Sequence, residues 1–197
     1  MQKISLVNGE KARQTAKGLY PYEKWELLEN GIFIARSRMP RSAEQVKILE
    51  KELQQARILA ERGSTIYLLP ETAHSYEKRI KYPDAVVDDL VMEFKTITGS
   101  IRQIEQRYKE ARAKTAHVFI KIDADLSLHD VRRKLAGCIN RKKYTGGIIL
   151  VYFSQIGELY QWSEAELASS SWLGQKKSGS QDPAAIQGKS DIPKCPR

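Results

Sequence analysis

Two acidic residues and one lysine, Asp84, Glu93 and Lys95, lie in a segment that the sequence predicts to be a β-hairpin. Short apolar runs flank Asp88 and Asp89, and a two-residue turn there places Asp84 opposite Glu93, although Asp-Asp is a weaker turn signal than Asp-Gly. Directly opposed residues on antiparallel strands have Cβ atoms roughly 4.5–5.5 Å apart, and like charges at that distance repel each other. A divalent cation would supply the missing positive charge, so the pattern predicts a metal site.

The predicted hairpin has one charged face and one apolar face. Side chains alternate along a strand, so Lys95 lies on the same face as Glu93. The opposite face is apolar without interruption and consists of Ala85, Val87, Leu90, Met92 and Phe94. We expect the apolar face to form core. A shift of the pairing by one residue would turn one strand's charged residues toward that core, so the predicted site depends on the turn.

The composition is that of one ordinary α/β domain with a basic balance. The chain has 197 residues, 41% of them hydrophobic, with a formal net charge of +9 and a pI near 9.5. This charge favours a polyanionic partner, and nucleic acid before a membrane. Residues 96–146 contain 12 Lys or Arg against 5 Asp or Glu, so most of the basic excess follows the carboxylates. No apolar run approaches the ~20 residues of a membrane span and no secretory signal is evident, which predicts a soluble, cytoplasmic protein.

Cysteine and histidine are not expected to bind metal or to act in catalysis. The two cysteines, Cys138 and Cys195, form no Cys-x-x-Cys pair and are interpreted as incidental thiols in a reducing compartment. The three histidines, His74, His117 and His129, are scattered without the spacing of metal ligands. The chemistry is therefore expected from carboxylates and lysine.

A helix is predicted over residues 42–62, and it carries a third acidic residue of interest. Ser42 and Gln45 resemble a capping box, and Gly63 ends the pattern. The predicted buried stripe consists of Val46, Leu49, Leu53, Ala56 and Ala60. At 100° per residue Glu52 falls on that stripe, whereas Glu50 falls outside it. A carboxylate on the buried side of a helix needs a function or a partner.

The remaining pattern predicts a mixed sheet with helices on its faces, which is the α/β class. The expected elements are two short strands around Asn30-Gly31, a strand at 64–70, a polar loop at 71–81, the hairpin, a helix from Ser100, a strand at 117–122, a helix from 127 to about 139 and a strand at 147–153. We interpret residues 1–41 as an N-terminal extension packed on the core and 42–160 as the main domain. Residues 161–197 form a C-terminal segment, which is expected to be disordered from about 175.

With Pro83-Asp84, Glu93-Phe94-Lys95 and an acidic residue on the preceding helix, the chain resembles the PD-(D/E)xK nuclease superfamily. The resemblance implies a restriction-endonuclease-like core and phosphodiester hydrolysis. It further implies that Glu52, Asp84 and Glu93 bind Mg²⁺ or Mn²⁺ and that Lys95 orients or activates the attacking water. Hydrolysis requires an activated water and stabilisation of negative charge on the phosphate, which a carboxylate-bound metal ion and an ammonium supply.

A narrower resemblance covers about residues 44–153. The helix ending in Leu59-Ala60-x-x-Gly63, the strand ending in Leu68-Leu69-Pro70-Glu71, and the acidic hairpin look similar to the C-terminal tRNA nuclease domain of contact-dependent inhibition toxins. This resemblance implies RNA, particularly tRNA, as substrate and an inhibitor (immunity) protein as partner. Two features depart from it: Asp89 stands where such hairpins often have Gly, and the chain starts with Met and stands alone, so delivery to another cell is not implied.

Alternatives remain open at this stage. Thr96, Ser100, Arg102 and Gln103 follow Lys95 and are candidates for contact with the substrate phosphate at a helix N-terminus. A DNA endonuclease of the same superfamily fits the composition as well as an RNase does, because both substrates present phosphates. A non-catalytic nucleic-acid-binding protein, in which the charged residues form a solvated strand face, is the competing class. If Glu52 points away from the hairpin, Glu50 or Glu71 would replace it.

Overall fold

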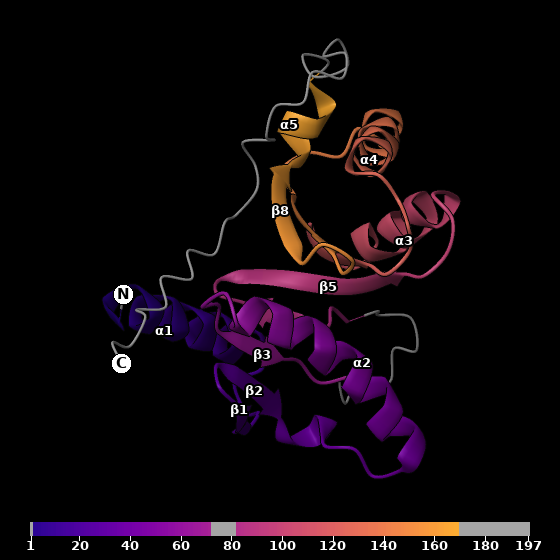
Figure 1. Ribbon diagram of the computed structural model, residues 1–197. Helices are drawn as coiled ribbons and strands as arrows, with labels where there is room; N and C mark the ends of the chain where they lie inside the picture. Colours follow the sequence, from indigo (N-terminus) through magenta and orange to yellow (C-terminus); the bar gives the residue numbers. More distant parts are fainter. Residues whose placement is uncertain (1, 72–81, 170–197) are drawn as a thin grey trace, which may run out of the picture.

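An eight-stranded mixed sheet forms the centre of the molecule, and the computed structural model describes residues 2–71 and 82–169, with side chains from residue 9 onward. The strands lie in the order in which they occur in the chain, β1 to β8, with helices on both faces (Figure 1). The predicted α/β class with a mixed sheet and flanking helices is confirmed. Several predictions concern residues outside the described ranges. These are the expected loop at 71–81, apart from position 71, His74, Cys195, and the tail expected to be disordered from about 175.

The elements alternate in a way that accounts for the strand directions. The helices are α1 (Gln2–Leu19), the short 3₁₀ helix η1 (Arg36–Arg38), α2 (Ala43–Ala60), α3 (Arg102–Arg112), α4 (Leu128–Lys142) and α5 (Glu164–Ala168). The strands are β1 (Trp25–Glu29), β2 (Ile32–Ala35), β3 (Ile66–Leu68), β4 (Ala85–Val87), β5 (Leu90–Ile97), β6 (His117–Ile122), β7 (Ile148–Phe153) and β8 (Glu158–Ser163). The parallel pairs β2/β3, β5/β6 and β6/β7 are joined through α2, α3 and α4, because a parallel pair needs a crossover connection.

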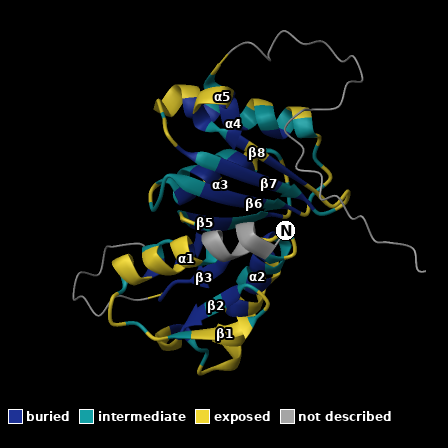
Figure 2. Cartoon of the chain, turned by 90° about the vertical axis from the view of Figure 1, so that its left-hand side faces the viewer, coloured by how far each residue is buried: buried dark blue, intermediate teal, exposed yellow. Residues whose placement is uncertain are grey.

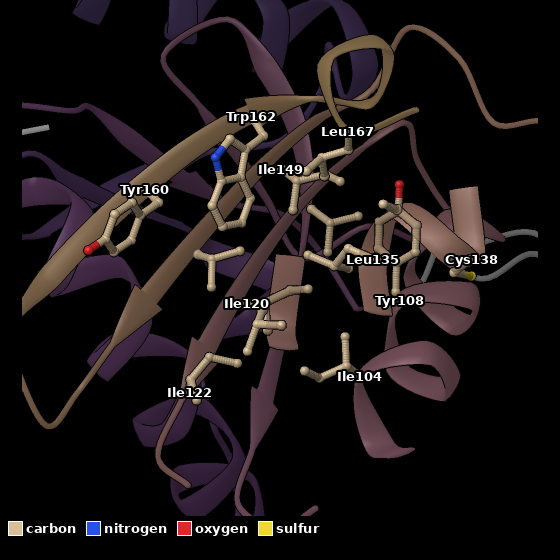
Figure 3. Close-up of a cluster of buried hydrophobic side chains, with 14 of the residues drawn as sticks. Ile104, Tyr108, Ile120, Ile122, Leu135, Cys138, Ile149, Tyr160, Trp162 and Leu167 are labelled. Atoms are coloured by element: carbon tan, nitrogen blue, oxygen red, sulfur yellow. The ribbon is translucent and has the colours of Figure 1, made fainter. Parts of the chain in front are cut away.

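The two faces of the sheet have separate apolar cores. The helix α2 covers one face with Leu49, Leu53 and Ala56, which pack on side chains of β2 to β8 such as Ile34 and Phe94. The helices α3, α4 and α5 cover the second half of the opposite face, where the largest cluster gathers (Figure 3). The helix α1 covers the first half of that face. The strand β1 lies at the edge and is largely exposed, as Figure 2 shows.

The hairpin has the predicted register. Val87 pairs with Leu90, and the ladder continues to Ala85 and Met92. Asp88 adopts a left-handed backbone with φ of 56°, and its backbone N–H donates to the Thr65 carbonyl at 2.8 Å. Its carboxylate accepts a hydrogen bond from the Thr65 backbone N–H at 3.0 Å. These two bonds to Thr65, which directly precedes β3, explain why an aspartate is stable at a turn position that usually favours glycine.

The predicted capping of α2 is confirmed, but part of the predicted stripe is wrong. The Ser42 side chain accepts from the backbone N–H of Gln45, and Leu49 and Leu53 are buried as expected. Val46, expected in the stripe, is instead 51% exposed. All residues from 41 to 48 are exposed, because the N-terminal part of α2 extends past the sheet (Figure 1). Helical periodicity in the sequence does not show at which residue a helix stops packing on the sheet.

Both ends of the sheet extend past the expected domain limits. The two strands around Gly31, which has φ of +73°, are confirmed, and β2 pairs with β3, so residues 25–35 belong to the sheet. The helix α1 was not predicted. At the other end, β8 crosses the expected boundary at residue 160, and α5 follows it. Among the described helices, none combines the length and apolarity needed to cross a membrane.

Candidate active site

The Asp84 carboxylate is fixed at the start of the hairpin. Its Oδ2 accepts a hydrogen bond from the backbone N–H of Phe94 at 2.7 Å, and its own backbone N–H donates to the Met92 carbonyl at 3.1 Å. The residue therefore lies directly across from β5, just before the first residue of β4. The predicted pairs from Val87–Leu90 to Ala85–Met92 are present, and the two bonds of Asp84 go to Met92 and Phe94, the residues on either side of Glu93.

Glu93 is a buried carboxylate between two ammonium groups. Its side chain is 0% exposed, and Oε1 lies 2.5 Å from the Lys95 Nζ and 2.6 Å from the Lys114 Nζ. Its other oxygen, Oε2, is buried and has no hydrogen-bond partner in the part of the chain that the structure describes. A buried carboxylate oxygen without a donor is costly, which makes this atom a candidate for contact with a ligand.

Lys114 joins the site from a different element, and sequence reasoning missed it. It follows the C-terminal end of α3, and its Nζ lies 3.9 Å from the Asp84 Oδ1 as well as 2.6 Å from the Glu93 Oε1. The next residue, Thr115, donates its hydroxyl hydrogen to the Val91 carbonyl at 2.6 Å, which holds this segment against β5. In sequence Lys114 is one of many basic residues, and no local signal separates it from the others.

Glu52 forms an ion pair with Arg38 rather than with the hairpin. The Arg38 side chain is 3% exposed and its Nη2 bonds the Glu52 Oε2. Its Nη1 donates to the Leu69 carbonyl at 2.7 Å and to the Asp84 carbonyl at 2.8 Å. Arg38 thus links the helical acid to the backbone of the hairpin acid. It lies in η1, within a run of arginines whose pattern is equally typical of a solvated linker.

The three acids approach from different faces of the sheet. Phe94 contributes to the core under α2, and strand alternation places Glu93 and Lys95 on the opposite face together with Ile97, which packs with α3 and α4. Glu52 lies on α2. The two sides meet at the strand ends, where Arg38 contacts both Leu69 and Asp84. Asp84 is therefore the central acid of the three.

The electrostatics agree with this central position. Burial raises the pKa of Glu52 to about 7; Arg38 opposes the shift, whereas the charges of Asp84 and Glu71 add to it. Burial also raises the pKa of Glu93, and the charge of Asp84 raises it further, against the hydrogen bonds from the two lysines. Both effects follow from removing a carboxylate from water beside another negative charge.

Gln55 is a second residue that sequence reasoning missed. It is buried on α2, one turn after Glu52, and its Nε2 donates to the Lys95 carbonyl and to the Thr96 Oγ1, both at 2.9 Å. These bonds fix α2 against β5 at the position of Lys95. At 100° per residue Gln55 lies outside the predicted buried stripe, so helical periodicity did not mark it.

The residues predicted to contact phosphate lie away from Glu93. Thr96 accepts from Gln55, and the Gln103 Oε1 accepts from the Gly99 backbone N–H at 3.1 Å. Ser100 and Arg102 are exposed. The helix α3 has 11 residues, about 16 Å of length, and it is its C-terminal end that reaches Glu93 through Lys114. The structure thus brings Lys114 to the Glu93 carboxylate, and Arg102 lies at the far end of α3.

The other candidates have no comparable position. Glu50 is exposed and pairs with Arg57, and Glu71 is exposed, although its charge acts on Glu52. The His117 Nδ1 accepts from the Ile148 backbone N–H at 3.1 Å, and burial lowers the pKa of this histidine. Cys138 is a buried free thiol in the core under α4.

The side chains fit a hard divalent ion such as Mg²⁺ or Mn²⁺ in chemistry. Glu52, Asp84 and Glu93 each have one oxygen bonded to a protein donor, and the Glu93 Oε2 has no hydrogen-bond partner among the described residues. Carboxylate oxygens are the ligands that these ions prefer. In residues 2–71 and 82–169 as they stand, no three His, Cys, Asp or Glu side chains are arranged as a ready metal site. Cations of the protein hold the acids instead.

Comparisons with protein-family models, with curated proteins and with solved structures found no match to this chain.

Proposed function

We propose that the protein is a divalent-metal-dependent nuclease that hydrolyses phosphodiester bonds. The observation that carries the proposal is the buried Glu93 carboxylate beside Asp84, with Lys95 bonded to one of its oxygens and the other oxygen without a donor. A structural salt bridge has no need for a buried acceptor that remains unsatisfied. The arrangement also agrees with the resemblance to the PD-(D/E)xK superfamily.

Each residue has a distinct part in the proposed reaction. Asp84 and Glu93 bind the metal ion, and Glu52 contributes from α2. Lys95 holds its ammonium beside Glu93, where it orients the attacking water and balances charge on the phosphate. A bound Mg²⁺ or Mn²⁺ would lower the pKa of the water and neutralise the phosphate charge.

Arg38 and Gln55 are positioning residues in this proposal. Arg38 fixes the carboxylate of Glu52 relative to the Asp84 backbone. Gln55 fixes the Lys95 backbone against α2. Both side chains are almost fully buried, so each is pre-organised before substrate arrives.

RNA, and tRNA in particular, is the proposed substrate, on the resemblance to the toxin domain; DNA is the alternative. The net charge of +9 favours either polyanion. An inhibitor protein as partner is proposed on the same resemblance.

The test is cleavage of end-labelled tRNA and of plasmid DNA with Mg²⁺, Mn²⁺ or EDTA. We expect cleavage with metal only, and a loss of about 10³-fold or more in Glu93→Gln and Lys95→Gln, because both touch the reacting groups. Glu52→Gln is compared with Glu50→Gln, an exposed acid on the same helix, which should cut as the wild type does. If the wild type cuts neither substrate with any divalent ion, the proposal fails.

A non-catalytic nucleic-acid-binding protein is the second candidate. It is favoured by one observation: each of the three carboxylates already has a cationic partner, Arg38, Lys95 or Lys114. On that reading the wild type and Glu93→Gln bind tRNA equally tightly, and neither releases labelled fragments with any metal. Binding measured by gel shift beside the cleavage assay separates the two functions.

A further inference from the structure

With all three acids ionised, the charges of the candidate site balance within the protein. Three carboxylates, Glu52, Asp84 and Glu93, stand against three cations that contact them. A divalent ion added to this set would leave an excess of two positive charges in a poorly solvated place. Such an excess is unfavourable unless a protein cation leaves or an anion enters.

Lys114 is the cation whose position conflicts most directly with a metal ion. Lys95 contacts Glu93, its neighbour on the same strand, and Arg38 contacts Glu52. Of these three cations, Lys114 is the one that contacts two acids on opposite sides of the hairpin, with its Nζ at 2.6 Å from the Glu93 Oε1 and 3.9 Å from the Asp84 Oδ1. A metal ion shared by these two carboxylates must approach the same space.

The surroundings of Lys114 allow its side chain to move while its backbone stays in place. The backbone N–H donates to the Ala111 carbonyl at 2.9 Å, and the following Thr115 is bonded to β5. The Lys114 side chain is 20% exposed, so its ammonium can rotate toward solvent. A lysine ammonium is strongly hydrated and lies at the end of a flexible four-carbon chain, so its movement into solvent costs little free energy.

We propose that Lys114 is a displaceable counterion, which holds Asp84 and Glu93 together without metal and leaves their shared space when a divalent ion binds. The inference rests on the proposed function in one respect, that Asp84 and Glu93 bind the metal ion. Lys114 keeps the two acids from repelling each other in the metal-free protein, and it keeps metal affinity low. Once displaced, its ammonium lies beside the bound metal, where it attracts the phosphate of the substrate.

The experiment is titration of the full chain with Mn²⁺, with free Mn²⁺ measured by electron paramagnetic resonance. We expect Lys114→Gln to bind Mn²⁺ about tenfold or more tightly than the wild type, because a positive charge close to the ion is removed. Lys114→Arg retains the charge and should bind as weakly as the wild type. Lys121→Gln is the matched control, since Lys121 is 16% exposed and pairs with Asp123 at 2.8 Å, away from the two acids.

Thermal unfolding gives a second measurement that does not depend on activity. Without metal, Lys114→Gln should melt below the wild type, since Asp84 and Glu93 lose the cation that they share. Mn²⁺ should then raise its melting temperature by more than that of the wild type, because the ion binds the folded state more tightly.

The outcomes separate this inference from the proposed function. If Lys114→Gln binds Mn²⁺ no more tightly than the wild type and Lys121→Gln, Lys114 is no competitor of the metal and the inference is overturned, even where the wild type cuts tRNA. If no variant binds Mn²⁺, the inference is overturned as well. If, in addition, the wild type cleaves neither substrate, the proposed function fails with it.

Discussion

Two glutamates, Glu93 and Glu164, have side chains that are 0% exposed, and the difference between them separates chemistry from architecture. The Glu164 carboxylate accepts from the Tyr108 hydroxyl and from the Gly147 backbone N–H at 2.9 Å, and it pairs with the Arg112 Nε at 2.7 Å. Both of its oxygens have partners. Glu93 has two ammonium groups on one oxygen and no donor on the other within the described structure.

The comparison teaches that burial alone does not mark a functional acid. Glu164 joins α5 to α3 and to the start of β7, so its charge is part of the packing. Tyr108, its neighbour in the large core of Figure 3, has a raised pKa because of burial and of this carboxylate. Glu93 is held by side chains that can move toward water. An incompletely satisfied acid is the one that is ready to bind something else.

The largest expected effect is on Glu164. Glu164→Gln should lower the free energy of unfolding by about 3 kcal/mol, because Arg112 would lose its buried counterion. Glu93→Gln should lower it by about 1 kcal/mol or less, because both lysines can reach solvent. Urea denaturation at pH 7 measures both. Equal losses would break the distinction between the two acids.

Gly147 offers a test of the close packing around Glu164. A Cβ at this position would lie 2.4 Å from the Ala116 carbonyl oxygen and 2.6 Å from the Glu164 side chain. Gly147→Ala should therefore cost about 2–3 kcal/mol of stability by overpacking. Gly137→Ala, in the interior of α4 with 3.5 Å to its nearest neighbour, is the control and should be neutral or stabilising by up to about 1 kcal/mol. Denaturation of both variants measures this, and similar losses would contradict the close packing at Glu164.

Glu52, in the candidate active site, should make the stability of the protein depend on pH. Its pKa is raised to about 7 in the folded protein from an ordinary value of 4.5, so the folded state binds a proton that the unfolded state releases. Its contribution to stability is fully present below about pH 4.5 and is lost as pH rises through 7. From pH 5 to 8, the wild type should lose about 2 kcal/mol relative to Glu52→Gln. If the free energy of unfolding changes with pH in the same way for the two proteins, Arg38 keeps Glu52 ionised throughout.

Glu105 gives the smallest expected effect, because its ion pairs lie at the surface. Hydrogen bonds from Lys109, Lys134 and Arg141 lower its pKa to about 2. Its contribution is present above the ordinary value of 4.5 and is lost as pH falls toward 2. Glu105→Gln should therefore cost less than about 1 kcal/mol at pH 7 and still less at pH 3. A loss at pH 7 as large as that of Glu164→Gln would show that exposure does not weaken this network.

Much of the fold followed from local pattern. The hairpin register, the Ser42 cap and the strand at 117–122 were predicted because alternation and capping chemistry act between near neighbours. The helix α1 and the strand β8 were not predicted. Val46 was assigned to the core because helical periodicity holds along α2, whereas the sheet beneath it ends earlier.

The sequence by itself determined that Asp84, Glu93 and Lys95 share one end and one face of a hairpin, since strand alternation and a two-residue turn leave little choice. Only the tertiary structure decided which cations meet these acids. Arg38 comes from η1 and Lys114 from the end of α3, and both reach the site because the sheet places β2, β3, β4 and β5 side by side in that order. Contacts between elements distant in sequence depend on packing, which no local pattern records.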